Sequence, residues 1–167
     1  MVSKSTSLGG ETMGIGPSTK ETSLHMFRDP LVKVLGEDTD IDFAGIVVVG
    51  TPDDNKYKNL VGQRAAAWCE AMRADGVILS ADGWGNSHVD YANTFEEIGK
   101  RGIPTVGVTF NGVQAKFVVT NKYMDTIVDI NKSESGTETE VVGENNVDII
   151  DARKALVFLK LKMRKAK

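Results

Sequence analysis

The sequence is short of the residues that most often build covalent frameworks and metal sites. Its 167 residues include one cysteine, Cys69, and two histidines, His25 and His88, which lie far apart. A single cysteine excludes an internal disulfide, and a Cys-rich zinc site needs several thiolates. We therefore expect no metal site. Cys69 falls at an apolar position of a predicted helix, where a buried and unreactive thiol is expected.

Long hydrophobic runs and an excess of charge of one sign are also absent. No apolar stretch approaches the roughly 20 residues of a transmembrane helix, and none near Met1 resembles the core of a secretory signal. The formal net charge of -3 argues against a mainly electrostatic nucleic-acid binder. We expect a cytoplasmic protein that binds neither nucleic acid nor a membrane.

The residues that are present predict one compact domain. Hydrophobic residues make up 41% of the chain, which is enough for a core. Residues 1–20 are rich in Ser, Thr, Gly and Lys and are predicted to be flexible. Residues 21–167 are predicted to form a single α/β domain. Its first part, an apolar arm at 21–36, is expected to pack on the domain or across a homo-oligomer interface.

The stretch from 74 to 107 has the pattern of a strand, a glycine-rich loop, a helix and a second strand. Residues 77–81 are apolar, as is typical of a strand buried on both faces. The helix after the loop carries apolar residues at helical spacing and is predicted to end at Gly102. The next strand is predicted at 105–110. This order is typical of a βαβ crossover between parallel strands.

Other elements complete the prediction of a three-layer α/β sandwich with a mostly parallel central sheet. Residues 46–50 are predicted as the first central strand. The helix at 57–74 should follow it, with these residues at helical spacing: Leu60, Val61, Arg64, Ala65, Trp68, Cys69 and Met72. Residues 126–130 and 139–142 are predicted to add an antiparallel edge hairpin. Asp148 is the predicted N-cap of a last helix, whose basic end we interpret as solvated.

The loop after residue 81 gathers more reactive groups than any other stretch. In parallel sheets, ligands collect at the carboxyl ends of the strands, where this loop is expected to lie. We predict Asp82 and His88 as catalytic residues. The predicted substrate-binding residues are Gly83, Trp84, Gly85, Asn86, Ser87, Asn121 and Tyr123.

Each of these residues also has a structural alternative. His88 could bond within the start of the helix, Trp84 could anchor the core, and Asp82 could orient the turn. Ser87, His88 and Asp90 do not predict a hydrolase triad, because consecutive helical side chains diverge by about 100°.

Four stretches together resemble the family of the D-proline reductase proprotein and its shorter paralogues. This family belongs with the subunits of component B of glycine, sarcosine and betaine reductase. The stretches are residues 16–30, 82–110, 121–133 and 141–163. Residues 83–88 look like the family's own loop. The resemblance implies reductive amino-acid cleavage of the Stickland type, together with other reductase subunits.

The resemblance also implies a cofactor that this sequence does not clearly supply. The family's proproteins cleave themselves and present a pyruvoyl group, which acts as an electron sink. This sequence is much shorter, has no obvious cleavage cysteine and contains no selenocysteine. Lys100 is a poor site for a substrate imine, because it lies a helix length from the loop. We expect a subunit or accessory component that does not reduce D-proline alone.

Two other functions remain open. The stretch at 74–87 resembles that of flavodoxin-like FMN-dependent reductases, although the proline and tyrosine of their loop are missing. The chain could also be a non-catalytic interaction module that uses its apolar arm and basic last helix.

Overall fold

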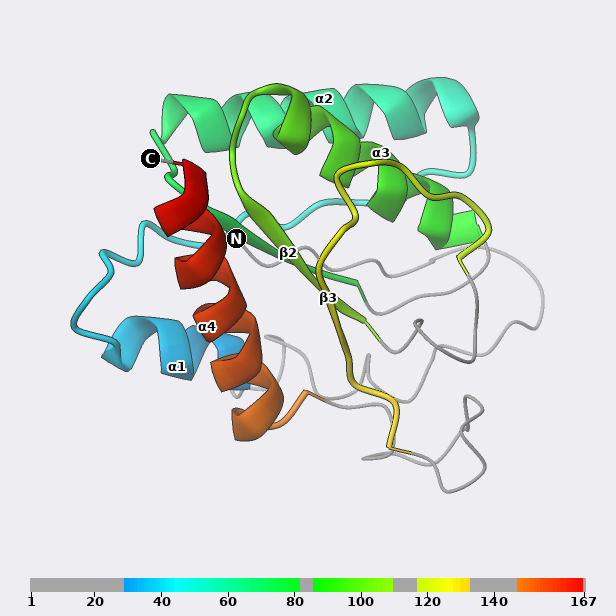
Figure 1. Ribbon diagram of the computed structural model, residues 1–167. Coiled ribbons are helices and arrows are strands. Elements are labelled where there is room, and N and C mark those ends of the chain that lie inside the picture. The colour runs from blue at the N-terminus through cyan, green and yellow to red at the C-terminus, as the bar shows by residue number, and fades with distance from the viewer. Residues whose placement is uncertain (1–28, 82–85, 110–116, 133–146, 167) are drawn as a thin grey trace.

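The structure, a computed structural model, describes residues 29–81, 86–109, 117–132 and 147–166 (Figure 1). The described elements are α1 (Pro30–Glu37), α2 (Asn55–Ala71), β1 (Val77–Ser80), α3 (Asn86–Lys100), β2 (Thr105–Thr109), β3 (Ile127–Asp129) and α4 (Ile149–Ala166). The predicted flexible segment at 1–20, the first half of the arm (21–28) and the predicted strand at 139–142 lie outside the described residues.

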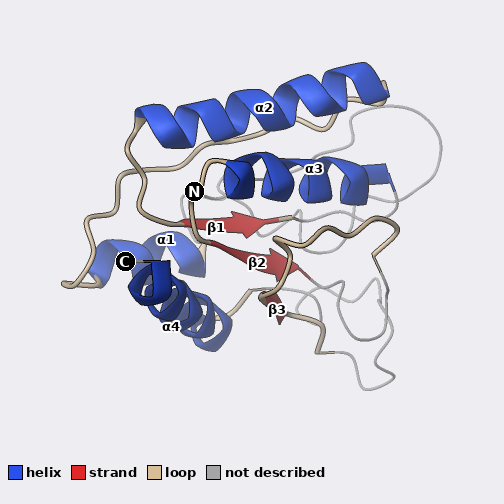
Figure 2. Ribbon diagram, turned by 45° about the horizontal axis from the view of Figure 1, so that its top comes forward, coloured by secondary structure: helices blue, strands red, loops and turns tan. Residues whose placement is uncertain are grey.

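A parallel sheet forms the middle layer. Its strands lie in the order β1-β2-β3, and both pairs are parallel. Helices α2 and α3 cover one face, and α1 and α4 cover the other (Figure 2). The predicted three-layer α/β architecture with a mostly parallel sheet is therefore confirmed.

One predicted strand is wrong, and the predicted direction of another is wrong. Residues 46–50 are not part of the sheet, and Val48 is largely exposed. Their β-branched composition favours a strand, but a strand also needs a neighbour to pair with. Among the described residues, β1 pairs only with β2. The segment predicted as an antiparallel edge at 126–130 instead forms β3, parallel to β2. A long crossover separates β2 from β3, and such a connection returns the chain in the same direction.

The core lies on both faces of the sheet, because successive strand residues point to opposite sides. From β1, Ile78 packs toward α1 and α4, whereas Val77 and Leu79 pack toward α2 and α3. Gly107 in β2 allows α3 to approach closely. A Cβ at that position would lie 2.3 Å from the Tyr91 hydroxyl oxygen.

Local signals fix the helix ends. Gly102, at φ +73°, follows the end of α3, as predicted for a C-terminal glycine. Asp54 caps α2 by accepting a hydrogen bond from the Lys56 N–H at 2.8 Å. In the described part of the arm, Leu31 and Leu35 of α1 are buried in the core that α4 also lines. This part of the arm therefore packs on the domain.

Candidate functional site

Helix α3 and the residue that follows it contact three neighbours, which are the sheet, α2 and the segment at 117–124. The residues that face the sheet are Tyr91, Phe95 and Ile98. Those with contacts to α2 are Asp90, Asn93 and Arg101. The segment at 117–124 contacts the His88 and Tyr91 rings, the Ala92 carbonyl oxygen and Gly99. His88 and Asp90 therefore serve different sides of the helix.

His88 is buried beneath the start of the segment that leads to β3. Its ring lies 5.3 Å from the Phe117 ring, centroid to centroid, and its Nδ1 lies 3.5 Å from the Val118 backbone nitrogen. Tyr91 stacks on the same Phe117 ring, with the two ring centroids 5.9 Å apart. In this arrangement His88 holds residues 117–118 against α3.

Tyr91 ties α3 to the sheet. Its hydroxyl donates a hydrogen bond to the Leu79 carbonyl oxygen at 3.0 Å. Burial raises the pKa of the Tyr91 phenol, so the group remains protonated. The phenol therefore serves as a structural hydrogen-bond donor at this position.

Asn121 and Tyr123 fix the same segment along α3. The Asn121 side-chain amide donates to the Ala92 carbonyl oxygen at 2.8 Å, and its oxygen accepts from the Tyr123 N–H at 3.0 Å. The Tyr123 ring packs on Gly99, where a Cβ would approach within 2.4 Å. Gly99 lies about 16 Å along the helix from His88, at a rise of 1.5 Å per residue. Asn121 thus lies about one turn from His88, whereas Tyr123 lies near the far end of α3.

The predicted loop is only partly described. Asp82, Gly83, Trp84 and Gly85 lie outside the described residues, as does the side chain of Asn86. Asn86 begins α3, and the half-buried Ser87 lies in its first turn. A binding or catalytic role for this loop stays a prediction.

A buried ion pair between α2 and α3 was missed by the sequence reasoning. The Lys58 Nζ lies 2.6 Å from Asp90 Oδ2, and the two side chains are only 1% and 5% exposed. The other carboxylate oxygen, Asp90 Oδ1, is buried and has no hydrogen-bond partner in the described part of the chain. Burial raises the pKa of the Asp90 carboxyl, while the hydrogen bond from Lys58 lowers it.

Sequence spacing could have revealed this pair. Lys58 precedes Gly62, Ala65, Ala66 and Cys69 on the face of α2 that is buried. A lysine on a face of small residues is a signal for a buried partner, because a buried charge needs an opposite charge.

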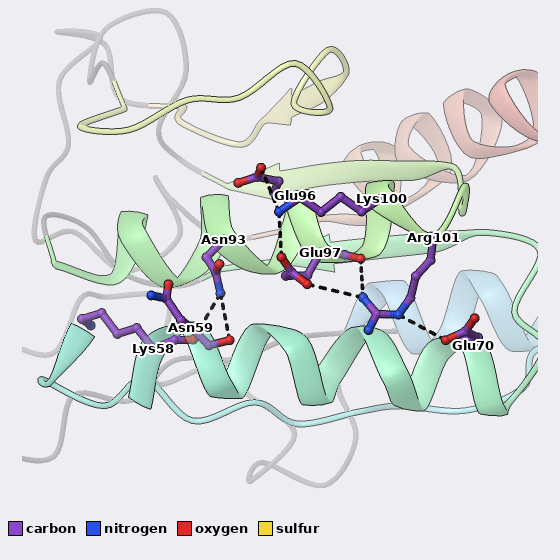
Figure 3. A network of polar contacts seen from close by, with 8 residues as sticks. All are labelled: Lys58, Asn59, Glu70, Asn93, Glu96, Glu97, Lys100 and Arg101. Atoms are coloured by element: carbon purple, nitrogen blue, oxygen red, sulfur yellow. Dashed lines mark hydrogen bonds and ion pairs between the residues drawn. The ribbon is translucent and has the colours of Figure 1, made fainter. Parts of the chain in front are cut away.

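Polar contacts continue along the two helices (Figure 3). Asn93 donates to the Lys58 carbonyl oxygen at 3.2 Å, and Arg101 reaches Glu70 of α2 at 3.2 Å. Lys100 instead pairs within α3, with Glu97 at 2.9 Å. A hydrogen bond to Glu97, and a weaker one to Glu96, raise the pKa of the Lys100 ammonium group. A lysine that holds its proton is a poor nucleophile toward a carbonyl carbon.

Comparison with known proteins agrees with the family resemblance. Residues 8–135 match the family of glycine/sarcosine/betaine reductase component B subunits. The chain belongs to this family. It is 44% identical over 146 residues to the D-proline reductase proprotein PrdA of Acetoanaerobium sticklandii. That alignment covers 87% of this chain but only 23% of the proprotein. No solved structure matches the chain.

In this member of the component B family, Cys69 does not fit a cleavage site that would produce a pyruvoyl group. It lies inside α2 and is buried, as predicted, and burial raises the pKa of its thiol. Cleavage there would break the helix that packs on α3. No group of three His, Cys, Asp or Glu residues in the described ranges could hold a metal ion. Within the same ranges, no helix is long and apolar enough to cross a membrane.

Proposed function

We propose that the chain is an accessory subunit of an amino-acid reductase complex of the D-proline or glycine reductase type. The observation that carries the proposal is its 44% identity, over most of its length, to a D-proline reductase proprotein. The proposal includes a cytoplasmic location, contacts with other reductase subunits and self-association in the complex.

The environments of the reactive side chains support an accessory role. Lys58 is held in a buried ion pair, Cys69 is buried inside a helix, and Lys100 is held protonated by two glutamates. An imine-forming lysine needs an amine that loses its proton, and a reactive cysteine needs an accessible thiolate. We propose that the reductive step takes place on another subunit.

The test is an assay with D-proline and dithiothreitol that measures 5-aminovalerate. We expect the purified chain to form none and a tagged chain to co-purify with active reductase subunits. Mass spectrometry should show that the chain remains uncleaved. Product formation by the chain alone, at a rate comparable to the complex, would place the catalytic group here. Failure to co-purify with any reductase subunit would reject the proposed complex.

We also propose that the loop at 82–88 contributes to the complex at the carboxyl edge of the sheet. Parallel sheets bind ligands at this edge. His88→Gln keeps a polar side chain of similar length and is expected to reduce turnover of the complex more than it lowers stability. Equal turnover for wild type and variant would remove His88 and this loop from the functional site.

A further inference from the structure

Helix α2 has three faces, and one of them is buried against the rest of the domain. The face that packs on α3 and β1 consists of Lys58, Gly62, Ala65, Ala66 and Cys69. A second face is polar and carries the Glu70 contact to Arg101. The third face bears large apolar side chains that point into solvent, which reverses the usual pattern of a surface helix.

The third face is a continuous stripe. Tyr57, Leu60, Trp68 and Met72 are 54%, 43%, 62% and 38% exposed, and Arg64 lies among them, also exposed. Their spacing places all five within about 120° of the helix circumference, over a length of about 22 Å. We name these five residues the α2 stripe. It lies on the outermost helix of its layer, on the side of the sheet opposite α1 and α4 (Figure 2).

The composition of the α2 stripe is that of an interface centre. Trp, Tyr and Arg dominate the binding energy of protein interfaces, and Met is enriched there as well. A solvated helix face has no need for an exposed Trp68 beside Tyr57 and Met72. The contact with α3 is made instead by the small residues of another face.

Arg64 indicates which kind of partner fits. It makes no ion pair with any of the described residues, yet it lies between Leu60 and Trp68. A partner that covers the stripe removes water from this guanidinium, and a desolvated charge needs an opposite charge. A second copy docked by two-fold symmetry along α2 would place Arg64 near its own equivalent, where like charges repel.

We propose that the α2 stripe docks a different polypeptide, whose apolar face carries a carboxylate opposite Arg64. In the proposed function this polypeptide is another reductase subunit, and the inference rests on that proposal only for the partner's identity. Trp68 anchors the contact through the apolar area that the partner covers, and Arg64 selects the partner by its charge.

The test uses the full chain and two synthetic amphipathic helices of about 20 residues, a length at which isolated helices form. Both peptides carry the same Leu and Phe stripe, but one has a central Glu and the other a central Lys. Fluorescence anisotropy should show that the Glu peptide binds at least about tenfold more tightly. Trp68→Ala should weaken its binding by a similar factor, and Arg64→Glu should reverse the preference between the peptides.

A matched control lies on the opposite layer. Phe158 of α4 is 41% exposed. Phe158→Ala removes this aromatic side chain and should leave peptide binding unchanged. Circular dichroism checks that all variants fold.

Three outcomes would overturn the inference. These are equal or absent binding of both peptides, no effect of Trp68→Ala, and a dimer in sedimentation that Trp68→Ala dissociates, which would assign the stripe to a second copy. The peptide assay requires no reductase, so loss of co-purification with intact peptide binding would reject only the proposed function.

Discussion

Lys58 places an ammonium group between two helices, at a point where the neighbouring residues of α2 are small. Such a pair is costly to break, because removal of one partner leaves a buried charge without compensation. Replacement of both partners by apolar residues of similar volume is often neutral or stabilising. We therefore expect the pair at Lys58 and Asp90 to specify how α2 packs on α3 more than it adds to stability.

The first prediction concerns this pair. Lys58→Met should lower the free energy of unfolding by about 3–5 kcal/mol, whereas Lys58→Met combined with Asp90→Leu should recover most of the loss. Urea denaturation at neutral pH measures both values. A loss below about 1 kcal/mol for Lys58→Met would show that the charges are not enclosed.

The pH dependence of the Lys58→Met variant provides a second check. Burial raises the pKa of Asp90 in the folded state, so the folded protein binds a proton at a pH where the unfolded chain has released it. Stability of the variant should therefore rise as the pH falls from 7 toward about 4.5, near the ordinary range of carboxyl groups. The deficit relative to wild type should shrink over the same interval, and a constant deficit would contradict the assignment.

Among the elements, α3 and α4 could be predicted well from the sequence, because their signals are local. These signals are an N-cap residue, apolar residues at helical spacing and a glycine after the last turn. Each lies in the helix or directly beside it. Asp148 illustrates this, since it accepts hydrogen bonds from the Ile150 N–H at 2.7 Å and the Asp151 N–H at 2.9 Å. The prediction that Asp148 caps the last helix is confirmed.

The faces of α2 could not be predicted in the same way. Its large apolar residues Leu60 and Trp68 look like core residues, but α3 offers Asp90 and Asn93 to the opposite face, where only small side chains and Lys58 fit. The strand expected at 46–50 failed for a similar reason. Burial and pairing depend on neighbours that are distant in the sequence, so periodicity alone cannot assign them.

The candidate site was predictable only in part. Glycines and polar residues marked the loop, but sequence spacing did not show that His88 lies under Phe117 or that Tyr123 packs at Gly99. Both contacts depend on the path of the crossover along α3. The segment's role in covering the helix could not be read from the residues themselves.

The cap of α4 gives the prediction at this scale. Asp148→Ala should cost about 1 kcal/mol of stability, whereas Asp148→Asn, which keeps an accepting oxygen, should cost less. Hydrogen bonds from backbone groups, with Asp151 first, hold the pKa of Asp148 below its ordinary value. The contribution of the Asp148 carboxylate to the free energy of unfolding is thus present above about pH 4 and is lost as the pH falls further. Thermal unfolding of the three proteins at neutral and acidic pH tests both statements.

At the scale of the whole molecule, one core cluster joins elements from distant parts of the chain. Leu31 of α1 is fully buried there, together with Leu156 and Leu159 of α4 and with the face of the sheet that α1 and α4 cover. Lys160 also bridges to Asp38 at 2.7 Å. This face of the sheet is therefore completed by helices that lie far apart in the sequence.

Truncation of Leu31 should affect the molecule as a unit. Leu31→Ala should lower the free energy of unfolding by about 2–5 kcal/mol, through lost burial and the cavity that remains. Ile150→Ala, at an exposed position of α4, should change it by less than about 0.5 kcal/mol. Denaturation followed by circular dichroism provides the values. Equal effects of the two variants would mean that α1 is not part of the core.

The contact between α1 and α4 also sets a condition on how the chain folds during synthesis. Lys160 is added to the growing chain 122 residues after Asp38, which corresponds to roughly 6–24 s of translation. During this time Leu31 and Leu35 have no α4 to cover them, and the apolar face of the new sheet stays open. We therefore expect a nascent chain that lacks α4 to expose apolar surface that the folded protein buries.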